Sequence, residues 1–278
     1  MSGRYNAKLM QSHFIIKKVC TRKINHSQIA DYDRHGDNMA FDGVVVANIV
    51  QELKNALTGG RINKIAQPEK DEIILTIKGQ AREPYKLLLC ADAGLPLLYL
   101  TDANKTNPLT APNFCMLLRK YLGSARILEI TQPGLERIVS FKLEHLDEMG
   151  DRCIKYLIIE LMGKHSNIIF CDDRMKIIDS IKRINQFVSS VREVLPGRDY
   201  FIPRTTEKYD PLTIDYEAFR EGVLKKPMLI SKALYSSLTG ISPLLANELC
   251  CRASIDPELS PADLGDDAGL HLFKNLER

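Results

Sequence analysis

The strongest constraint on the fold is a series of short apolar runs between residues 61 and 182, separated by tight turns. In Glu72–Lys78, large aliphatic side chains alternate with other residues, which is the pattern of a half-buried strand. The connections between successive runs are short, and short connections favour antiparallel pairing over crossover units. The sequence therefore predicts an antiparallel sheet, with one helix inserted near residues 113–122.

Helices are predicted both before and after this strand-rich region of the sequence. Asp42 can cap a helix over Gly43–Leu57, in which apolar residues recur at steps of three and four, and Gly59-Gly60 can end it. From Leu212 onward the apolar period becomes helical. The expected helical segments are Tyr216–Leu224, Leu229–Leu238, Pro243–Arg252, for which Ser242 is the predicted cap, and a weaker one that starts at Ser260-Pro261. We expect an α+β fold, a β-rich sandwich with inserted helices, followed by a small helical domain.

Composition narrows the class of protein. An apolar fraction of 45% and a charged fraction of 26% are typical of a globular chain. No stretch approaches the roughly 18–20 uninterrupted apolar residues of a membrane span, and Lys17-Lys18 interrupts the one apolar run near the start, so no secretory signal is predicted. The seven cysteines include no Cys-x-x-Cys pair, which indicates reduced thiols and a cytoplasmic protein. No His has the spacing of a zinc site, so we expect neither a metal nor a cofactor.

The formal net charge of +3 is unevenly distributed. Residues 1–38 contain seven Lys/Arg and three Asp/Glu, a balance of +4, whereas residues 39–278 hold 31 basic and 32 acidic residues, a balance of −1. A nucleic-acid surface must therefore be a local patch. Residues 1–38 also lack apolar periodicity, and we interpret them as a disordered leader or as an extension ahead of a natural start at Met39. The alternative is a basic arm that contacts phosphate.

The stretch Pro112–Phe141 concentrates its charges at two places. Arg119-Lys120 lies on the inserted helix, and Glu136-Arg137 follows the turn at Pro133-Gly134. These four residues either form one surface or are solvated charges on a helix and a hairpin. Spacing alone leaves both interpretations open.

Other basic residues lie in predicted turns and linkers. Lys164-His165 lies between two apolar strands, and a basic loop on a rigid sheet suits contact with an RNA backbone. Arg192 and Arg198 flank a Pro-punctuated linker and are candidates for the same role. Each of these residues has the alternative of a solvated charge. No nucleophile elbow, phosphate loop or other catalytic constellation is present in the sequence.

Many short motifs follow one another in a fixed order over residues 39–278. They are Phe41-Asp42-Gly43, Gly59-Gly60-Arg61-Ile62, Gln67-Pro68, residues 114–120, Gly134-Leu135-Glu136-Arg137-Ile138, residues 160–167, Asp179-Ser180-Ile181-Lys182 and Val194-Leu195-Pro196-Gly197. In this order they resemble the N-terminal part of the NFACT proteins, the family of bacterial RqcH, also called the fibronectin-binding protein A family. Residues 1–38 fall outside the resemblance.

The resemblance implies a ribosome quality-control factor. Such a factor binds tRNA, with alanyl-tRNA expected, and large ribosomal subunits obstructed by a peptidyl-tRNA, and it supports template-free alanine tailing of the stalled chain. It implies an NFACT-N domain at 39–205 that resembles the N-terminal domain of formamidopyrimidine-DNA glycosylases. It also implies a helix-two-turn-helix-like domain at 206–278, leading to a coiled coil and an RNA-binding domain that are missing after Arg278.

The resemblance assigns the family's functional residues to two places in this sequence. Its acidic–Arg pair for tRNA recruitment, usually Asp-Arg, matches Glu136-Arg137, in which the carboxylate is longer by one methylene. Lys164 stands where the family usually has Arg before His165, which keeps the charge but loses a bidentate fork.

Two alternatives to this function remain. One is an adhesin with fibronectin or fibrinogen as a partner, although no signal peptide or disulfide framework is predicted. The other is a glycosylase-like nucleic-acid binder without activity. Glycosylase chemistry needs an N-terminal proline amine, and residues 39–42 supply no proline, so the sequence predicts a protein that is not an enzyme.

Overall fold

The computed structural model describes residues 41–79, 81–189, 191–202 and 207–277. The predicted leader at 1–38, the predicted start at Met39 and the predicted domain boundary at 205/206 lie outside the described residues. The chain divides into two compact units. The sheet unit comprises Asn48–Thr131 and Ile138–Ile202, and the helical unit comprises residues 41–47, Gln132–Arg137 and 207–277.

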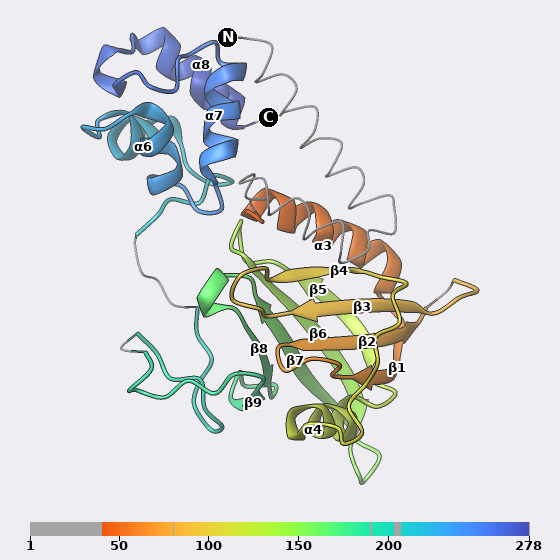
Figure 1. Cartoon of the computed structure of the whole chain (residues 1–278). Coiled ribbons are helices and arrows are strands. Elements are labelled where there is room, and N and C mark those ends of the chain that lie inside the picture. Colours follow the sequence, from red (N-terminus) through yellow and green to blue (C-terminus); the bar gives the residue numbers. More distant parts are fainter. Residues whose placement is uncertain (1–40, 80, 190, 203–206, 278) are drawn as a thin grey trace. The chain divides into compact units, whose positions relative to one another are not determined.

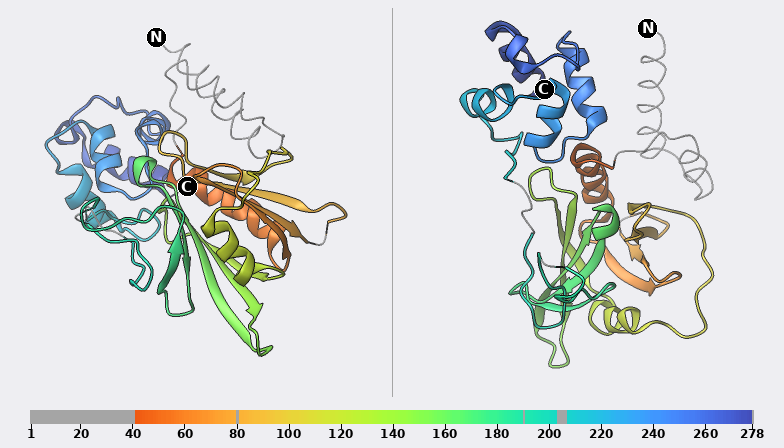
Figure 2. Two further views of the ribbon diagram at one scale, coloured as in Figure 1. Left: turned by 60° about the horizontal axis from the view of Figure 1, so that its bottom comes forward. Right: turned by 60° about the vertical axis from the view of Figure 1, so that its left-hand side comes forward.

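The sheet unit contains the predicted antiparallel strands. Within the described residues, nine strands form one sheet in the order β4-β3-β2-β1-β5-β6-β7-β8-β9, and each pair of neighbours is antiparallel. The strands are β1 (Arg61–Ala66), β2 (Glu72–Lys78), β3 (Tyr85–Cys90), β4 (Leu97–Leu100), β5 (Arg126–Thr131), β6 (Ile138–Leu146), β7 (Arg152–Glu160), β8 (Asn167–Cys171) and β9 (Ile177–Ser180). Figures 1 and 2 show β2–β4 and β5–β8 as two layers, and the α+β fold class is confirmed.

The sheet turns between its layers where β1 meets β5. Only Arg61 and Arg126 are paired in the ladder between these strands. The backbone of Ile127 accepts a hydrogen bond from Gly59 at 2.8 Å and donates one to Gly60 at 2.9 Å. Gly59 has φ +82°, a conformation that glycine adopts without steric cost. The predicted glycine stop therefore ends the preceding helix, α3 (Gly43–Leu57), and also leads the chain into the corner of the sheet.

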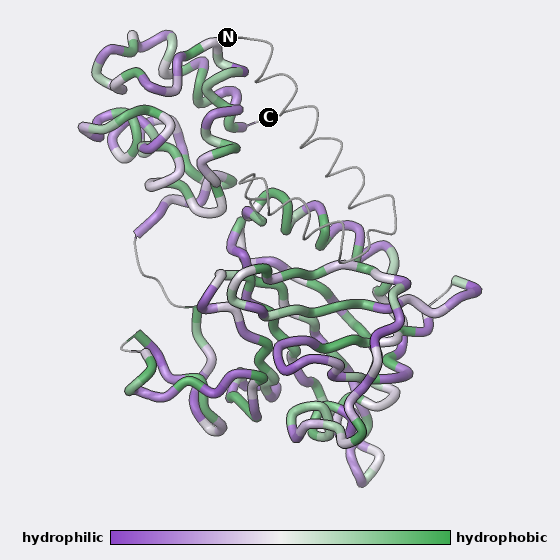
Figure 3. The backbone as a smooth tube through the Cα atoms, viewed as in Figure 1, coloured by the Kyte–Doolittle hydropathy of each residue, from purple (hydrophilic) through white to green (hydrophobic). Residues whose placement is uncertain are grey.

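The core of the sheet unit follows the apolar periodicity. Figure 3 shows apolar stretches along the strands and hydrophilic residues at the turns. Phe141 and Phe170, on β6 and β8, are among the largest fully buried side chains. The inserted helix is α4 (Asn113–Leu122), which buries Phe114, Cys115 and Leu118. No helix among the described residues is long and apolar enough to cross a membrane.

The helical unit has its own core. Its elements are α5 (Tyr216–Phe219), the π-helical turn η2 (Arg220–Leu224), α6 (Ile230–Ser237), α7 (Pro243–Arg252), the 3₁₀ turn η3 (Pro261–Asp263) and α8 (Asp266–Leu276). Phe219, Leu234 and Leu272 belong to one buried apolar cluster. The predicted start at Ser260-Pro261 is wrong for the last helix, because Ser260 caps η3, which begins at Pro261, and α8 begins only at Asp266.

Three backbone segments of the helical unit approach one another closely at Gly43, Leu135 and Gly240. The amide of Gly43 donates to the carbonyl of Gly240 at 2.9 Å. A Cβ atom would lie 2.0 Å from the Leu135 oxygen if placed on Gly43 and 2.2 Å from it if placed on Gly240. Gly240 also has φ +73°. We call this three-segment contact the glycine junction, and it requires glycine at both positions.

Substitution of Gly43 by Ala should destabilise the helical unit by about 1–3 kcal/mol or more, despite the higher helix propensity of Ala, because the new methyl group meets a backbone oxygen. Urea unfolding followed by circular dichroism would measure the change. Gly265→Ala is the matched control, because a Cβ there meets nothing within 4 Å, and its cost should stay within about 1 kcal/mol. Equal losses in the two variants would contradict the role of the junction.

Candidate functional site

The candidate site is built on the turn Gln132–Arg137, which joins β5 to β6. Gly134 adopts φ +51°, and the amide of Glu136 donates to the carbonyl of Pro133 at 3.0 Å. The side-chain amide of Gln132 donates to the carbonyl of Glu136 at 2.8 Å and to that of Gly43 at 2.9 Å. The backbone that carries Glu136 and Arg137 is therefore held from both sides.

Beside this turn, the side chains that cap the N-termini of two helices are hydrogen-bonded to each other. Asp42 accepts from the amide of Val45 at 3.0 Å through Oδ1, and thereby caps α3. Its Oδ2 accepts from the hydroxyl of Ser242 at 2.7 Å, and Ser242 Oγ accepts from the amide of Leu245 at 3.1 Å, which caps α7. Both predicted caps are confirmed. Their direct contact, between residues 200 positions apart, has no signature in the local sequence.

Arg137 and Glu136 differ in exposure. Arg137 is exposed and Glu136 is half-buried. No hydrogen bond or ion pair joins the Arg137 guanidinium to any other described residue. An exposed guanidinium on a fixed backbone can donate to a phosphate or to the edge of a base.

Lys208 belongs to the same unit, and the sequence did not single it out. Its ammonium donates to the carbonyl of Tyr235, at the end of α6, at 2.8 Å. The pKa of Lys208 is lowered by burial first and then by the positive charges of Arg137 and Lys226, and Glu136 acts in the opposite sense. The carboxylate of Asp210, two residues after Lys208, lies against Gly134 of the turn, so Lys208 and Arg137 stand on touching segments.

Arg119 and Lys120 are exposed on α4, in the sheet unit. Arg119 Nε donates to the carbonyl of Ile65 at 2.9 Å, and Arg119 lines a shallow hollow with the neighbouring residues of β1. Lys120 Nζ lies 3.9 Å from Glu148 and 5.4 Å from the ring centroid of Tyr121. These residues and Glu136-Arg137 therefore belong to different compact units.

Lys164 and His165 are exposed in the 3₁₀ turn η1 (Gly163–His165). Ser166 Oγ accepts from the amide of Met162 at 2.8 Å, which closes the turn. Glu148, near Lys120, precedes β7, whereas η1 follows it, and the nine residues of β7 span about 30 Å. The sheet unit thus presents two basic sites at opposite ends of one strand.

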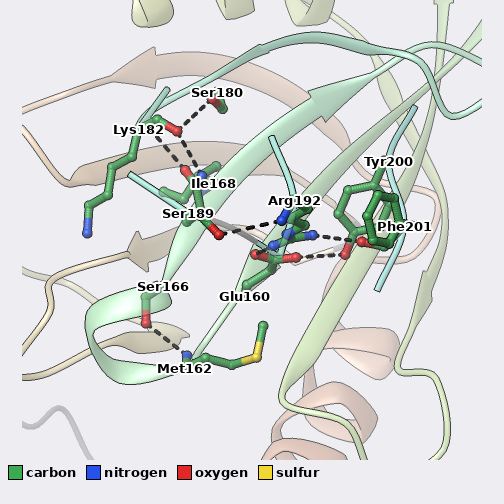
Figure 4. Close-up of polar contacts among 11 residues, drawn as sticks. Glu160, Met162, Ser166, Ile168, Ser180, Lys182, Ser189, Arg192, Tyr200 and Phe201 are labelled. Carbon is green, nitrogen blue, oxygen red and sulfur yellow. Dashed lines mark hydrogen bonds and ion pairs between the residues drawn. The ribbon is translucent and has the colours of Figure 1, made fainter. Parts of the chain in front are cut away.

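Arg192 has a structural partner. Its guanidinium forms an ion pair with Glu160, donates to the carbonyl of Phe201 at 2.7 Å and lies 5.6 Å from the ring centroid of Tyr200 (Figure 4). The Arg192 side chain is 9% exposed and that of Glu160 is 0% exposed. We therefore do not retain Arg192 as a candidate RNA contact.

The second linker arginine differs from Arg192. Arg198 is 61% exposed and lies 2.8 Å from Glu193. An exposed pair of this kind contributes little to stability. Arg198 stays a candidate for contact with a phosphate.

No group of three or more His, Cys, Asp or Glu side chains within the described ranges is arranged to hold a metal ion. The cysteines of these ranges are free thiols, and burial raises the pKa of Cys90 and Cys250 to about 11. The described residues of the helical unit contain eight Lys/Arg and fourteen Asp/Glu. Recognition of an anion by this unit therefore depends on a local group of donors, such as the one around Arg137.

The comparisons with known proteins identify the family. Residues 42–278 match the family of NFACT N-terminal and middle domains. The chain therefore belongs to the NFACT family. It is 36% identical over 218 residues to "Rqc2 homolog RqcH" of Bacillus subtilis and 40% identical over 219 residues to that of Streptococcus suis, each alignment covering 78% of this chain. The chain covers 38% and 39% of these relatives, well under half of their length.

Solved structures confirm the fold. The N-terminal part of the fibronectin/fibrinogen-binding protein of Streptococcus suis superposes with a TM-score of 0.72 at 37% identity, covering 84% of this chain and 85% of that one. The N-terminal domain of the fibronectin-binding protein PavA of Streptococcus pneumoniae gives 0.69 at 39% identity, covering 76% and 78%. MutM of Thermus thermophilus gives 0.39 at 14% identity, with 84% of this chain and 71% of that one covered, which is too low to support an inference.

The buried pair Glu160–Arg192 gives a prediction about stability. Arg192→Met should cost about 3–5 kcal/mol at neutral pH, because it leaves a buried carboxylate without its partner. Arg198→Met is the matched control, and loss of that exposed pair should cost less than about 1 kcal/mol. Urea unfolding would measure both, and a similar cost for the two variants would contradict the assignment.

The same pair predicts a pH dependence. Burial raises the pKa of Glu160, against the opposing effects of Arg192 and Tyr200. Without Arg192, the folded state should favour protonated Glu160 still more. The deficit of Arg192→Met relative to the unmodified chain should therefore be smallest below pH 4.5, the ordinary pKa, and grow as the pH rises. Adding Glu160→Gln should remove this trend, and a pH-independent deficit would contradict it.

Proposed function

We propose that this chain is the N-terminal part of a ribosome quality-control factor. In this proposal it binds tRNA, alanyl-tRNA above all, together with the large ribosomal subunit obstructed by a peptidyl-tRNA. It thereby supports template-free alanine tailing of stalled nascent chains in the cytoplasm. Membership of the NFACT family and 36–40% identity to RqcH proteins support the proposal.

The observation that carries the proposal is the fixed turn with an exposed Arg137. Gln132 holds the backbone of the turn, and the glycine junction holds Leu135. On such a support, binding does not have to order the backbone, and only the Arg137 side chain is immobilised. In this proposal Arg137 contacts a tRNA phosphate or a base edge, and half-buried Glu136 orients Arg137 or accepts from a base amino group.

The basic residues of the sheet unit take a secondary part in this proposal. Arg119, Lys120, Lys164, His165 and Arg198 are exposed on rigid elements and would contact the RNA backbone. Because Lys120 and Lys164 lie at opposite ends of β7, they would contact separate stretches of RNA. The relatives extend well beyond the length matched here.

Adhesion to fibronectin or fibrinogen is the second candidate function. The two similar streptococcal proteins of known structure are named for binding fibronectin or fibrinogen, and this is the observation that favours it. Surface labelling of intact cells would test it, because an adhesin has to be exposed at the cell surface. A strong labelled pool would favour adhesion, whereas labelling at the level of cytoplasmic proteins would favour the RNA-binding role.

We further propose that the chain binds nucleic acid without glycosylase chemistry. Residues 39–42 contain no proline that could supply the amine nucleophile. Borohydride trapping on DNA with a damaged base would test this. No covalent adduct is expected, and a trapped adduct would contradict the proposal.

Arg137→Ala should weaken tRNA binding by about 1–3 kcal/mol if Arg137 makes a bidentate contact with a base. Filter binding with purified tRNA at fixed salt would measure the change. Arg252→Ala removes the same charge from the same unit, but Arg252 is already paired with Glu248 at 2.6 Å, so this control should bind like the unmodified chain. Equal affinities of Arg137→Ala and the unmodified chain would reject the assignment.

A further inference from the structure

The segment that carries Lys208 is fixed at several points within the helical unit. The amide of Tyr209 donates to the carbonyl of Ser237 at 2.8 Å, and the carbonyl of Tyr209 accepts from the amide of Thr239 at 2.9 Å. The Tyr209 ring lies against Gly222 of η2, where an added Cβ would be 2.2 Å from the ring. Lys208 is therefore held on a rigid backbone.

The same segment contacts the turn that carries Arg137. A Cβ on Gly134 would lie 2.9 Å from Oδ2 of Asp210, so the Asp210 carboxylate lies directly against the turn. Oδ1 of Asp210 accepts from the amide of Leu212 at 3.0 Å, which directs this carboxylate to its own backbone. Lys208 and Arg137 thus stand on two segments that touch at Asp210 and Gly134.

Lys226 lies on a third segment, two residues after the end of η2. Its carbonyl accepts from the amide of Met228 at 2.9 Å, and the sulfur of Met228 accepts from the hydroxyl of Ser236 at 3.6 Å. Ser236 is adjacent to Tyr235, whose carbonyl holds Lys208. The end of α6 therefore holds the segments of both lysines.

Three positive charges act on one another at this place, beside the carboxylates of Glu136 and Asp210. The positive charges of Arg137 and Lys226 both act on Lys208, and Glu136 is the carboxylate that acts on it in the opposite sense. The contact with Tyr235 occupies one of the three ammonium protons of Lys208, which leaves two for another acceptor. Cations gathered in this way repel one another, and an anion between them removes that repulsion.

We propose that Arg137, Lys208 and Lys226 form a phosphate-binding surface that takes neighbouring phosphates of an RNA backbone. This inference rests on the proposed function and deepens it, because it adds two backbone contacts to the site of Glu136 and Arg137. Lys208 and Lys226 bind irrespective of sequence, since a phosphate contact carries no base information. The surface thus sets affinity and register, and Arg137 with Glu136 provides any base contact.

The test is the salt dependence of tRNA binding by the 278-residue chain. Lys208→Met and Lys226→Met should each lower the slope of log K against log salt by about 0.7–0.9, because each removes one phosphate contact. At about 0.1 M salt this corresponds to roughly five- to tenfold weaker binding. Lys208→Arg should restore the slope, because it keeps the charge.

Lys225→Met is the matched control. Lys225 is the neighbour of Lys226 in sequence and carries the same charge, but it is paired with Glu221 at 2.6 Å. The slope for this control should equal that of the unmodified chain. Lys208→Met also loses the bond to Tyr235, so thermal unfolding is measured in parallel. A variant that is less stable but keeps its slope would show that Lys208 only caps α6, and this would overturn the inference.

Two further outcomes separate this inference from the proposed function. If the unmodified chain binds no tRNA, both fail. If Arg137→Ala weakens binding while Lys208→Met and Lys226→Met keep the full slope, the proposed function stands and the phosphate surface is rejected. Inorganic phosphate at constant ionic strength provides a third arm. Phosphate should weaken tRNA binding by the unmodified chain more than binding by Lys208→Met, because it competes for the donors that the variant lacks, and equal competition in both would contradict a phosphate contact at Lys208.

Discussion

The helical unit depends on the glycine junction, where the backbones of Gly43, Leu135 and Gly240 meet without room for a side chain. Because the segments approach so closely, Asp42 reaches Ser242, and one hydrogen bond links the caps of α3 and α7. Gln132 then ties the intervening turn to the carbonyl of Gly43. The close packing of these backbones therefore fixes the turn that carries Arg137. The position of the proposed site thus depends on a contact between backbone atoms.

The ion-pair partners of the basic residues are more informative about RNA binding than the net charge is. The balance of −1 over residues 39–278 gives no general attraction to RNA. Arg192 forms a buried pair with Glu160, and Arg198 lies beside Glu193. Arg137 and Lys208, by contrast, stand on touching segments of the helical unit, and the positive charge of Arg137 acts on Lys208. A nearly neutral protein can still present a cationic surface if its other charges are paired elsewhere.

Local patterns in the sequence predicted most of the fold. Alternation located the strands, and the Asp42 and Ser242 caps and the Gly59-Gly60 stop placed helix boundaries, because each acts within a few residues. The sequence could not show that Gln132–Arg137 groups with helices that begin beyond residue 215, nor that Glu160 holds Arg192. These contacts join distant segments. Lys208 was missed for the same reason, because its neighbours come from three separate stretches.

The central claim is that RNA binds the helical unit at the turn supported by the glycine junction. Amide hydrogen exchange, measured with and without purified tRNA, tests it most directly because it reports on every backbone segment at once. The account predicts slower exchange in Gln132–Arg137 and in 207–209, with smaller changes around η1 and α4. Protection confined to the sheet unit, or no protection anywhere, would contradict it.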